Sequence, residues 1–313
     1  MTILCTLMCV DRGLLDLDAP VAKYWPEFAQ EGKENLPVRY ILSHTSGLPG
    51  WDEKLTIEDY YKWDKVVSSL ASQKPWWEPG TKSGYHATTH GYLLGELVRR
   101  VTGKSLGTFF REEVTNPLGA DFHIGLSEEH DPRVAEMIFP PPDESVDLGA
   151  LDPELLVVKI FTNPLDPTPQ ETVNSRAWRA AEIPAGNGHG NARSIARITA
   201  TIARGGELDG IQLLSSNTIE EAIKEQIYDT DLVLLYPVRF GLGFGLNSKE
   251  RPLGPNPRSF CWSGLGGSLA VMDPDAKTSF AYAMNKMVIQ LADPKDPRAD
   301  KLNETFSNIV AKL

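Results

Sequence analysis

Cysteine and long apolar runs are scarce in this sequence. Cys5, Cys9 and Cys261 are the three cysteines among 313 residues, which is too few and too scattered for a disulfide framework. We therefore expect buried free thiols and a reducing, cytoplasmic location. No segment is apolar for the roughly 20 residues that a membrane-spanning helix needs. The apolar start, "MTILCTLMCV", lacks the basic residues and cleavage site of a signal peptide.

Basic residues are also fewer than acidic ones. The chain carries 31 Lys and Arg against 42 Asp and Glu, a formal net charge of −11. Such a surface repels nucleic acid and anionic lipid. We expect neither a nucleic acid nor a membrane as a partner.

Several motifs of common enzyme classes are missing. There is no G-x-S-x-G, which argues against an α/β-hydrolase. The glycine-rich "GLGFG" and "GNGHG" do not fit the dinucleotide pattern G-x-G-x-x-G. No metal-ligand spacing joins His44, His86 and His189, so we interpret them as structural hydrogen bonders. The sequence predicts no cofactor and no metal.

What is present is an apolar content of 41%, enough for a large core. Helix-like periodicity comes first along the chain and strand-like alternation comes late, which predicts an α+β fold. The stretch Met1 to Val10 is apolar on every side and predicts a buried helix ending near Gly13. Other expected helices lie at 57–73, 85–103 and 192–204 and from Asp296 onward; expected strands lie at 239–247, 259–274 and 278–287.

The expected organisation is a single domain of residues 1–313. A mostly helical region spans approximately 20–180, and a sheet-forming region spans approximately 190–313 together with the helix 1–12. The stretch 140–172 is rich in Pro and Asp, which predicts a long surface excursion.

Three stretches resemble one known family in composition and order. They are "HTSGL" (44–48), "WEPGTKSGYHA" (77–87) and "WSGLGG" (262–267). In this order they resemble the class C β-lactamase-like serine hydrolases, and most of all the family VIII carboxylesterases, over essentially the whole chain. The resemblance implies a β-lactamase/penicillin-binding-protein-like fold: an antiparallel sheet flanked by helices, with an inserted, mostly helical region.

The family's catalytic motifs are only partly present. The resemblance implies that Tyr85 is the general base and that Trp262, Ser263 and Gly264 form the third motif, with the backbone N–H of Leu265 in the oxyanion hole. The family's nucleophile motif, Ser-x-x-Lys, is absent, because no serine here has a lysine three residues later. By spacing it would fall just before Met1, so we expect the family's first strands and first helix to be missing as well.

The resemblance also bears on substrates. Where β-lactamases have a Lys and an Asn, this chain has Trp262 and Ala87, which favours neutral esters over β-lactams. Aromatic residues expected to line an apolar acyl or alcohol pocket are Trp51, Trp76, Trp77, Tyr236 and Trp262. Three functions stay open: ester hydrolysis through an acyl-enzyme if the product carries Ser-x-x-Lys, acyl transfer on the same scaffold, or a non-catalytic protein without the nucleophile.

Overall fold

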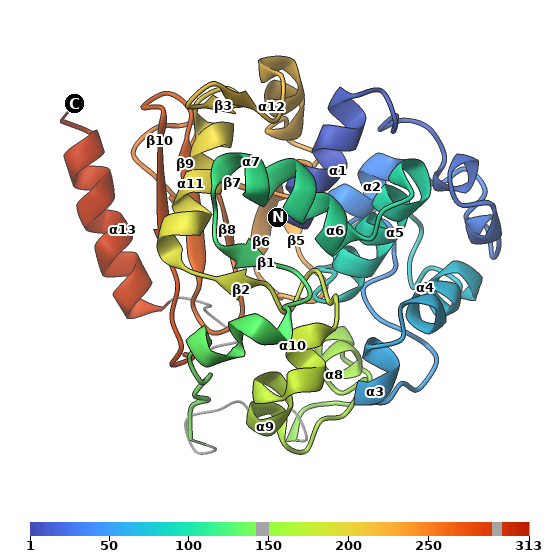
Figure 1. Cartoon of the computed structure of the whole chain (residues 1–313). Coiled ribbons are helices and arrows are strands. Elements are labelled where there is room, and N and C mark those ends of the chain that lie inside the picture. Colours follow the sequence, from blue (N-terminus) through green and yellow to red (C-terminus); the bar gives the residue numbers. More distant parts are fainter. Residues whose placement is uncertain (142–149, 290–295, 313) are drawn as a thin grey trace.

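The structure is a computed structural model that describes residues 1–141, 150–289 and 296–312. An antiparallel six-stranded sheet, in the order β10-β9-β8-β7-β6-β5, stands beside a helical region (Figure 1). The helices are α1 (Thr2–Asp11), α2 (Val38–Leu42), α3 (Ile57–Tyr60), α4 (Trp63–Ser72), α5 (Thr89–Thr102), α6 (Leu106–Phe110), α7 (Asn116–Leu118), α8 (Leu156–Phe161), α9 (Pro169–Asn174), α10 (Arg176–Ala180), α11 (Ala192–Ala203), α12 (Ser216–Ala222) and α13 (Pro297–Val310).

The strands of the large sheet are short. They are β5 (Ile227–Thr230), β6 (Pro237–Phe240), β7 (Gly245–Leu246), β8 (Phe260–Ser263), β9 (Leu269–Asp273) and β10 (Thr278–Tyr282). Two small ribbons accompany it, β1 (Phe122–His123) with β2 (His189–Gly190), and β3 (Glu207–Leu208) with β4 (Ile211–Gln212). Within the described residues, no helix has the length and apolar character needed to cross a membrane.

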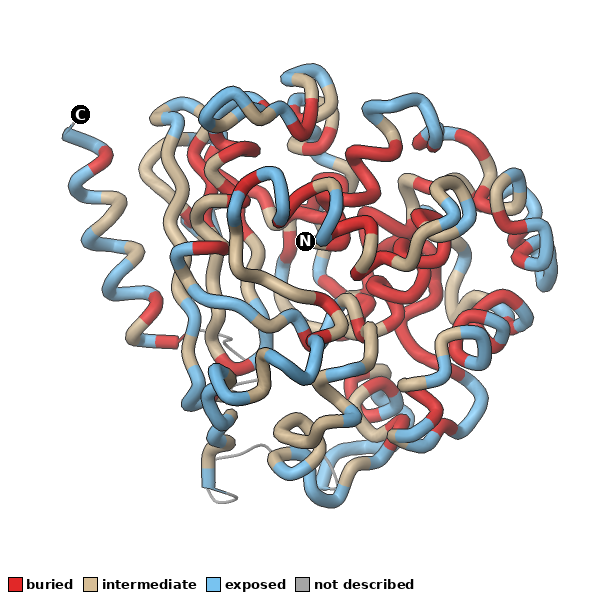
Figure 2. Tube along the Cα trace, in the orientation of Figure 1, coloured by how far each residue is buried: buried red, intermediate tan, exposed pale blue. Residues whose placement is uncertain are grey.

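Helix α1 lies in the middle of the molecule, as its all-round apolar sequence predicts. Every residue from Thr2 to Cys9 is buried (Figure 2). The Thr2 hydroxyl donates to the carbonyl oxygen of Pro184 at 3.0 Å, and α1 packs against α5, α6 and α12. Gly13 has a φ of +69°, the left-handed conformation that commonly ends a helix. The predicted buried helix is therefore confirmed.

The segment that precedes α5 differs from the prediction. Periodicity predicted a helix from residue 85, but α5 begins only at Thr89. The Tyr85 amide donates to the Asp231 carboxylate at 3.0 Å, and the His86 amide donates to His44 Nδ1 at 3.1 Å. These bonds hold residues 85–88 in a loop ahead of the first helical turn. The helix ends at Gly103 in the left-handed conformation, as predicted.

Other differences follow from tertiary packing. The expected helix 57–73 is two helices, α3 and α4, and α3 begins with a capping box between Thr56 and Asp59. The stretch 140–172 contains α8, whose Val157, Val158 and Ile160 are buried, so a wholly surface-exposed excursion was wrong for that part. Residues 142–149 of this stretch lie outside the described residues.

The late part of the chain forms the sheet as expected, but the expected strands 239–247 and 259–274 are each two antiparallel strands, β6 with β7 and β8 with β9. The predicted turn after β9 is present, and Asp273 Oδ1 accepts from the Ala276 amide at 2.9 Å to close it. Helix α11 covers β9 and β10, with Ser279 Oγ donating to the Ala196 carbonyl oxygen at 2.8 Å. Strand β5, which the sequence did not predict, pairs with β6 and completes the edge of the sheet.

Candidate active site

Tyr85 and the third motif meet between the helical region and the sheet. The Tyr85 ring lies 5.9 Å from the ring of Trp262, which sits near the end of β8. The ring of His44 lies 5.3 Å from Tyr85 and is stacked on Trp262 at 5.4 Å. The fold thus joins the three stretches on which the family resemblance was based.

A buried carboxylate holds the Tyr85 loop in place. Asp231 is fully buried, and its Oδ1 accepts from the amides of Tyr85 at 3.0 Å and of Val233 and Leu234 at 2.9 Å. Its Oδ2 accepts from the Ser83 hydroxyl at 2.6 Å. Sequence reasoning missed Asp231, because the only local signal was an Asp that can bond the amides two and three residues onward.

The electrostatic setting of Tyr85 disfavours its phenolate. Burial, followed by the neighbouring Tyr236 and Asp231, raises the pKa of Tyr85 to about 12. The hydroxyl is therefore protonated at neutral pH in this structure. A cation close to the ring would be needed to favour the phenolate that a general base requires.

The third motif ends in a tight turn. The Gly264 amide donates to the Ser268 carbonyl oxygen at 2.9 Å, and Gly266 and Gly267 have φ of +95° and +111°, values that favour glycine. Leu265 is 51% exposed at the tip of this turn. Within the described part of the chain its amide has no hydrogen-bond acceptor, so the N–H is free to meet a substrate oxygen.

The predicted pocket aromatics do not gather in one place. Tyr236 is close enough to Tyr85 to influence its pKa. Trp77 packs behind the Tyr85 loop, and its ring is 6.3 Å from the ring of His86. Trp76 donates to the side chain of Asp52. Trp51 is buried in the helical core against Tyr60 and Tyr92.

Three histidines lie close to one another beside Tyr85. His44, His86 and His90 are buried, and the rings of His44 and His90 are 4.2 Å apart. Burial lowers the pKa of His86 to about 3 and that of His90 to about 4, and it holds the pKa of His44 well below its usual range. All three rings are therefore neutral at physiological pH.

The stretches described contain no group of three or more His, Cys, Asp or Glu side chains arranged to hold a metal ion. The three cysteines are free thiols, and all are buried.

We expect Gly84→Ala to disturb the Tyr85 loop. A Cβ at Gly84 would lie 2.3 Å from Cη2 of the Trp77 ring, so the ring or the loop must move. Such overpacking costs about 2 kcal/mol of unfolding free energy, measurable by urea unfolding with tryptophan fluorescence. Gly186→Ala is the matched control, because its Cβ would meet nothing closer than 3.3 Å. Equal stability of the two variants would contradict this packing.

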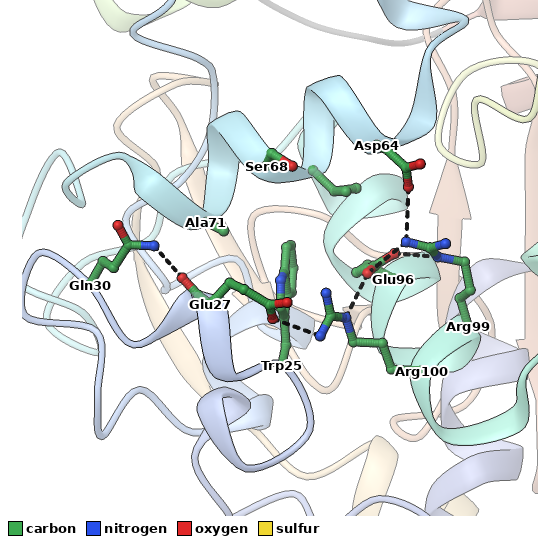
Figure 3. A pocket seen from close by; sticks show the side chains of 10 residues that line it. Trp25, Glu27, Gln30, Asp64, Ser68, Ala71, Glu96, Arg99 and Arg100 are labelled. Carbon is green, nitrogen blue, oxygen red and sulfur yellow. Dashed lines mark hydrogen bonds and ion pairs between the residues drawn. The ribbon is translucent and has the colours of Figure 1, made fainter.

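A separate cavity of about 240 Å³ lies in the helical region, between Trp25, α4 and α5 (Figure 3). Its centre is an ion-pair network, in which the buried Glu96 accepts from Arg99 and Arg100, each at 2.7 Å. Arg100 also donates to Glu27 at 2.7 Å. Both guanidinium groups are already paired and Tyr85 does not line this cavity, so we assign it a structural role.

Comparison with known proteins decides the family. The model of the beta-lactamase family matches residues 1–304. The chain belongs to the beta-lactamase family. This confirms the resemblance and the β-lactamase/penicillin-binding-protein-like fold that the sequence predicted.

Members of the beta-lactamase family with related sequences include esterases. The chain is 37% identical over 289 residues to "Esterase/beta-lactamase LipL" of Mycobacterium tuberculosis, covering 90% of this chain and 66% of that protein. It is 35% identical over 133 residues to "Esterase EstB" of Burkholderia gladioli, covering 37% of this chain and 33% of EstB. The chain thus spans less than two thirds of these relatives.

The structure is also similar to that of a family VIII carboxylesterase. The TM-score is 0.88 at 40% sequence identity, and the match covers 98% of this chain and 80% of the other.

Proposed function

We propose that this fold hydrolyses carboxylic esters through an acyl-enzyme, with Tyr85 as the general base. The observation that carries the proposal is the contact between the rings of Tyr85 and Trp262, three residues before Leu265, whose amide has no acceptor within the described residues. The similarity to LipL and to the family VIII carboxylesterase supports it.

The nucleophile in this proposal is the serine of a Ser-x-x-Lys placed directly before α1. The chain holds no such motif, but the position suits it, because the start of α1 lies near His90 and His90 packs on His44 beside Tyr85. The lysine of the motif would lower the pKa of Tyr85 from about 12 toward a value useful for catalysis.

The steps follow from this arrangement. Tyr85 takes the serine proton as the oxygen attacks the ester carbonyl carbon, and the Leu265 amide donates to the oxyanion. Collapse of the tetrahedral intermediate releases the alcohol, which receives the proton from Tyr85. Water then attacks the acyl-enzyme, with Tyr85 again as base, and Tyr85 returns that proton to the serine oxygen as the carboxylic acid leaves.

The test restores the motif. The residues that precede the counterpart of Met1 in the family VIII carboxylesterase are joined to this chain, and hydrolysis of 4-nitrophenyl acetate is measured. We expect turnover, and labelling of the grafted serine by a fluorophosphonate, whereas the 313-residue chain is not labelled. Methanol in the assay separates hydrolysis from acyl transfer, through the ratio of methyl ester to acid. Labelling of Ser83 or Ser263 in the 313-residue chain would overturn the proposal.

In the grafted enzyme, Tyr85→Phe should lower kcat by about 10²–10⁴-fold, because the phenol oxygen that moves the proton is lost. Tyr228→Phe is the matched control; it removes an exposed hydroxyl that bonds Glu250 and should leave kcat unchanged. Full activity of Tyr85→Phe would exclude Tyr85 as the base.

A further inference from the structure

An arginine that sequence reasoning did not single out reaches the site from another loop. Arg251 lies in the connection between β7 and β8. Its Nη2 donates to the Ser263 hydroxyl and its Nη1 to the Tyr236 hydroxyl, each at 3.3 Å. Its guanidinium carbon lies 6.0 Å from the centre of the Tyr236 ring. It therefore stands next to the third motif and to the tyrosine that neighbours Tyr85.

The charge of Arg251 has no counter-ion within residues 1–141, 150–289 and 296–312. Two other arginines of this part of the chain are paired: Arg239 of β6 with Glu225 at 2.7 Å, and Arg258 of the β7–β8 connection with Asp275 at 3.2 Å. Arg251 is half-buried, and its two bonds are long and go to neutral hydroxyls. A partly desolvated guanidinium without an anion is costly unless a ligand supplies one.

The connection that carries Arg251 is well anchored. The Arg251 amide donates to Ser248 Oγ at 3.0 Å, and the Leu253 amide donates to Asn247 Oδ1 at 2.9 Å. From α13, Asn303 Nδ2 donates to the Leu253 carbonyl oxygen at 3.1 Å. The guanidinium is thus held beside the site by bonds at several points.

We propose that Arg251 binds a carboxylate of the substrate, so that the preferred substrates are esters carrying a free carboxylate, such as monoesters of short dicarboxylic acids. This rests on the proposed function. The planar fork of N–H donors matches a carboxylate and can bind it with two parallel hydrogen bonds. The sequence favoured neutral esters because Trp262 stands where β-lactamases have a lysine; the fold supplies a cation from a different loop.

Binding is tested first on the 313-residue chain, which needs no catalysis. The probes are N-phenylsuccinamic acid and its methyl ester, which differ in one negative charge, with affinity measured by calorimetry at low salt. We expect at least tenfold tighter binding of the acid. Arg251→Gln should abolish the difference, and Arg251→Lys should retain part of it. Arg258→Gln, on the same connection but ion-paired elsewhere, should behave like wild type.

Equal affinity for the acid and its ester in the wild-type chain, or an unchanged preference in Arg251→Gln, would overturn the inference. Circular dichroism of each variant shows whether it has folded. If Arg251→Gln does not fold, the preference of Arg251→Lys for the acid over its ester is the test instead.

Specificity is then measured on the grafted enzyme with mono-4-nitrophenyl succinate and its methyl ester. We expect Arg251→Gln to lower the ratio of kcat/KM for the anionic ester to kcat/KM for the neutral ester about tenfold or more. If the chain prefers the anionic probe but the grafted enzyme cleaves neither ester, the proposed function fails while the binding site stands. If the enzyme cleaves both esters equally, the function stands and the inference fails.

Discussion

Asp231→Ala is expected to lower the free energy of unfolding by about 4 kcal/mol, since each buried donor left without its acceptor costs roughly 1–3 kcal/mol. The carboxylate accepts from the Ser83 hydroxyl and from the amides of Tyr85, Val233 and Leu234. All four donors lose their charged partner in a site that water reaches poorly. Urea unfolding at pH 8 measures the effect.

Two variants calibrate this loss. Ser83→Ala removes one donor together with its hydrogen, so it should cost about 1–2 kcal/mol. Asp229→Ala removes a nearby exposed carboxylate paired with Lys82 and should leave the urea midpoint close to that of wild type. If Asp231→Ala were no more damaging than Asp229→Ala, Asp231 would not anchor the Tyr85 loop.

The second large effect is acid destabilisation through His44, His86 and His90. Their pKa values in the folded state lie below the ordinary value near 6.5 because they are buried, reaching about 3 for His86 and about 4 for His90. Above pH 6.5 they are neutral in both the folded and unfolded states, so their contribution to stability is fully present. As pH falls below 6.5, the three histidines become protonated in the unfolded chain but stay neutral in the folded chain. Their contribution to stability is therefore lost.

At pH 5, His86 and His90 each contribute about 2 kcal/mol of this loss, and His44 adds to it. Together they amount to a large part of the stability of an ordinary domain. Urea unfolding at pH 8 and pH 5 measures the difference. A stability that does not change between these two pH values would contradict neutral, buried histidines.

His44→Asn tests the assignment to this cluster. His44 has a φ of +61°, a conformation that asparagine tolerates, and the asparagine Oδ1 can replace Nδ1 as acceptor for the His86 amide. One titrating ring, whose pKa lies well below its usual range, is removed, so the loss of stability between pH 8 and pH 5 should become smaller. An undiminished loss would place the acid sensitivity elsewhere in the molecule.

Local patterns in the sequence determined much of this protein. The apolar stretch Met1 to Val10 predicted the buried α1, and the turn after β9 was visible in its Asp-Pro-Asp spacing. The start of the last helix was predicted at Asp296, which is its N-cap. Motif order predicted the family, and with it the juxtaposition of Tyr85 and Trp262. Amphipathic period, caps and turns depend on neighbours along the chain, so a single sequence reveals them.

Tertiary structure decided which side chains stand beside Tyr85. Asp231 bonds an amide 146 positions away, and Arg251 reaches Ser263 from a connection that carries no motif. Trp51, expected in the pocket, packs instead into the helical core. A hydrogen bond between distant residues, or the face to which a tryptophan turns, depends on how helices and sheet pack against one another. Packing of this kind leaves no period or spacing in the sequence.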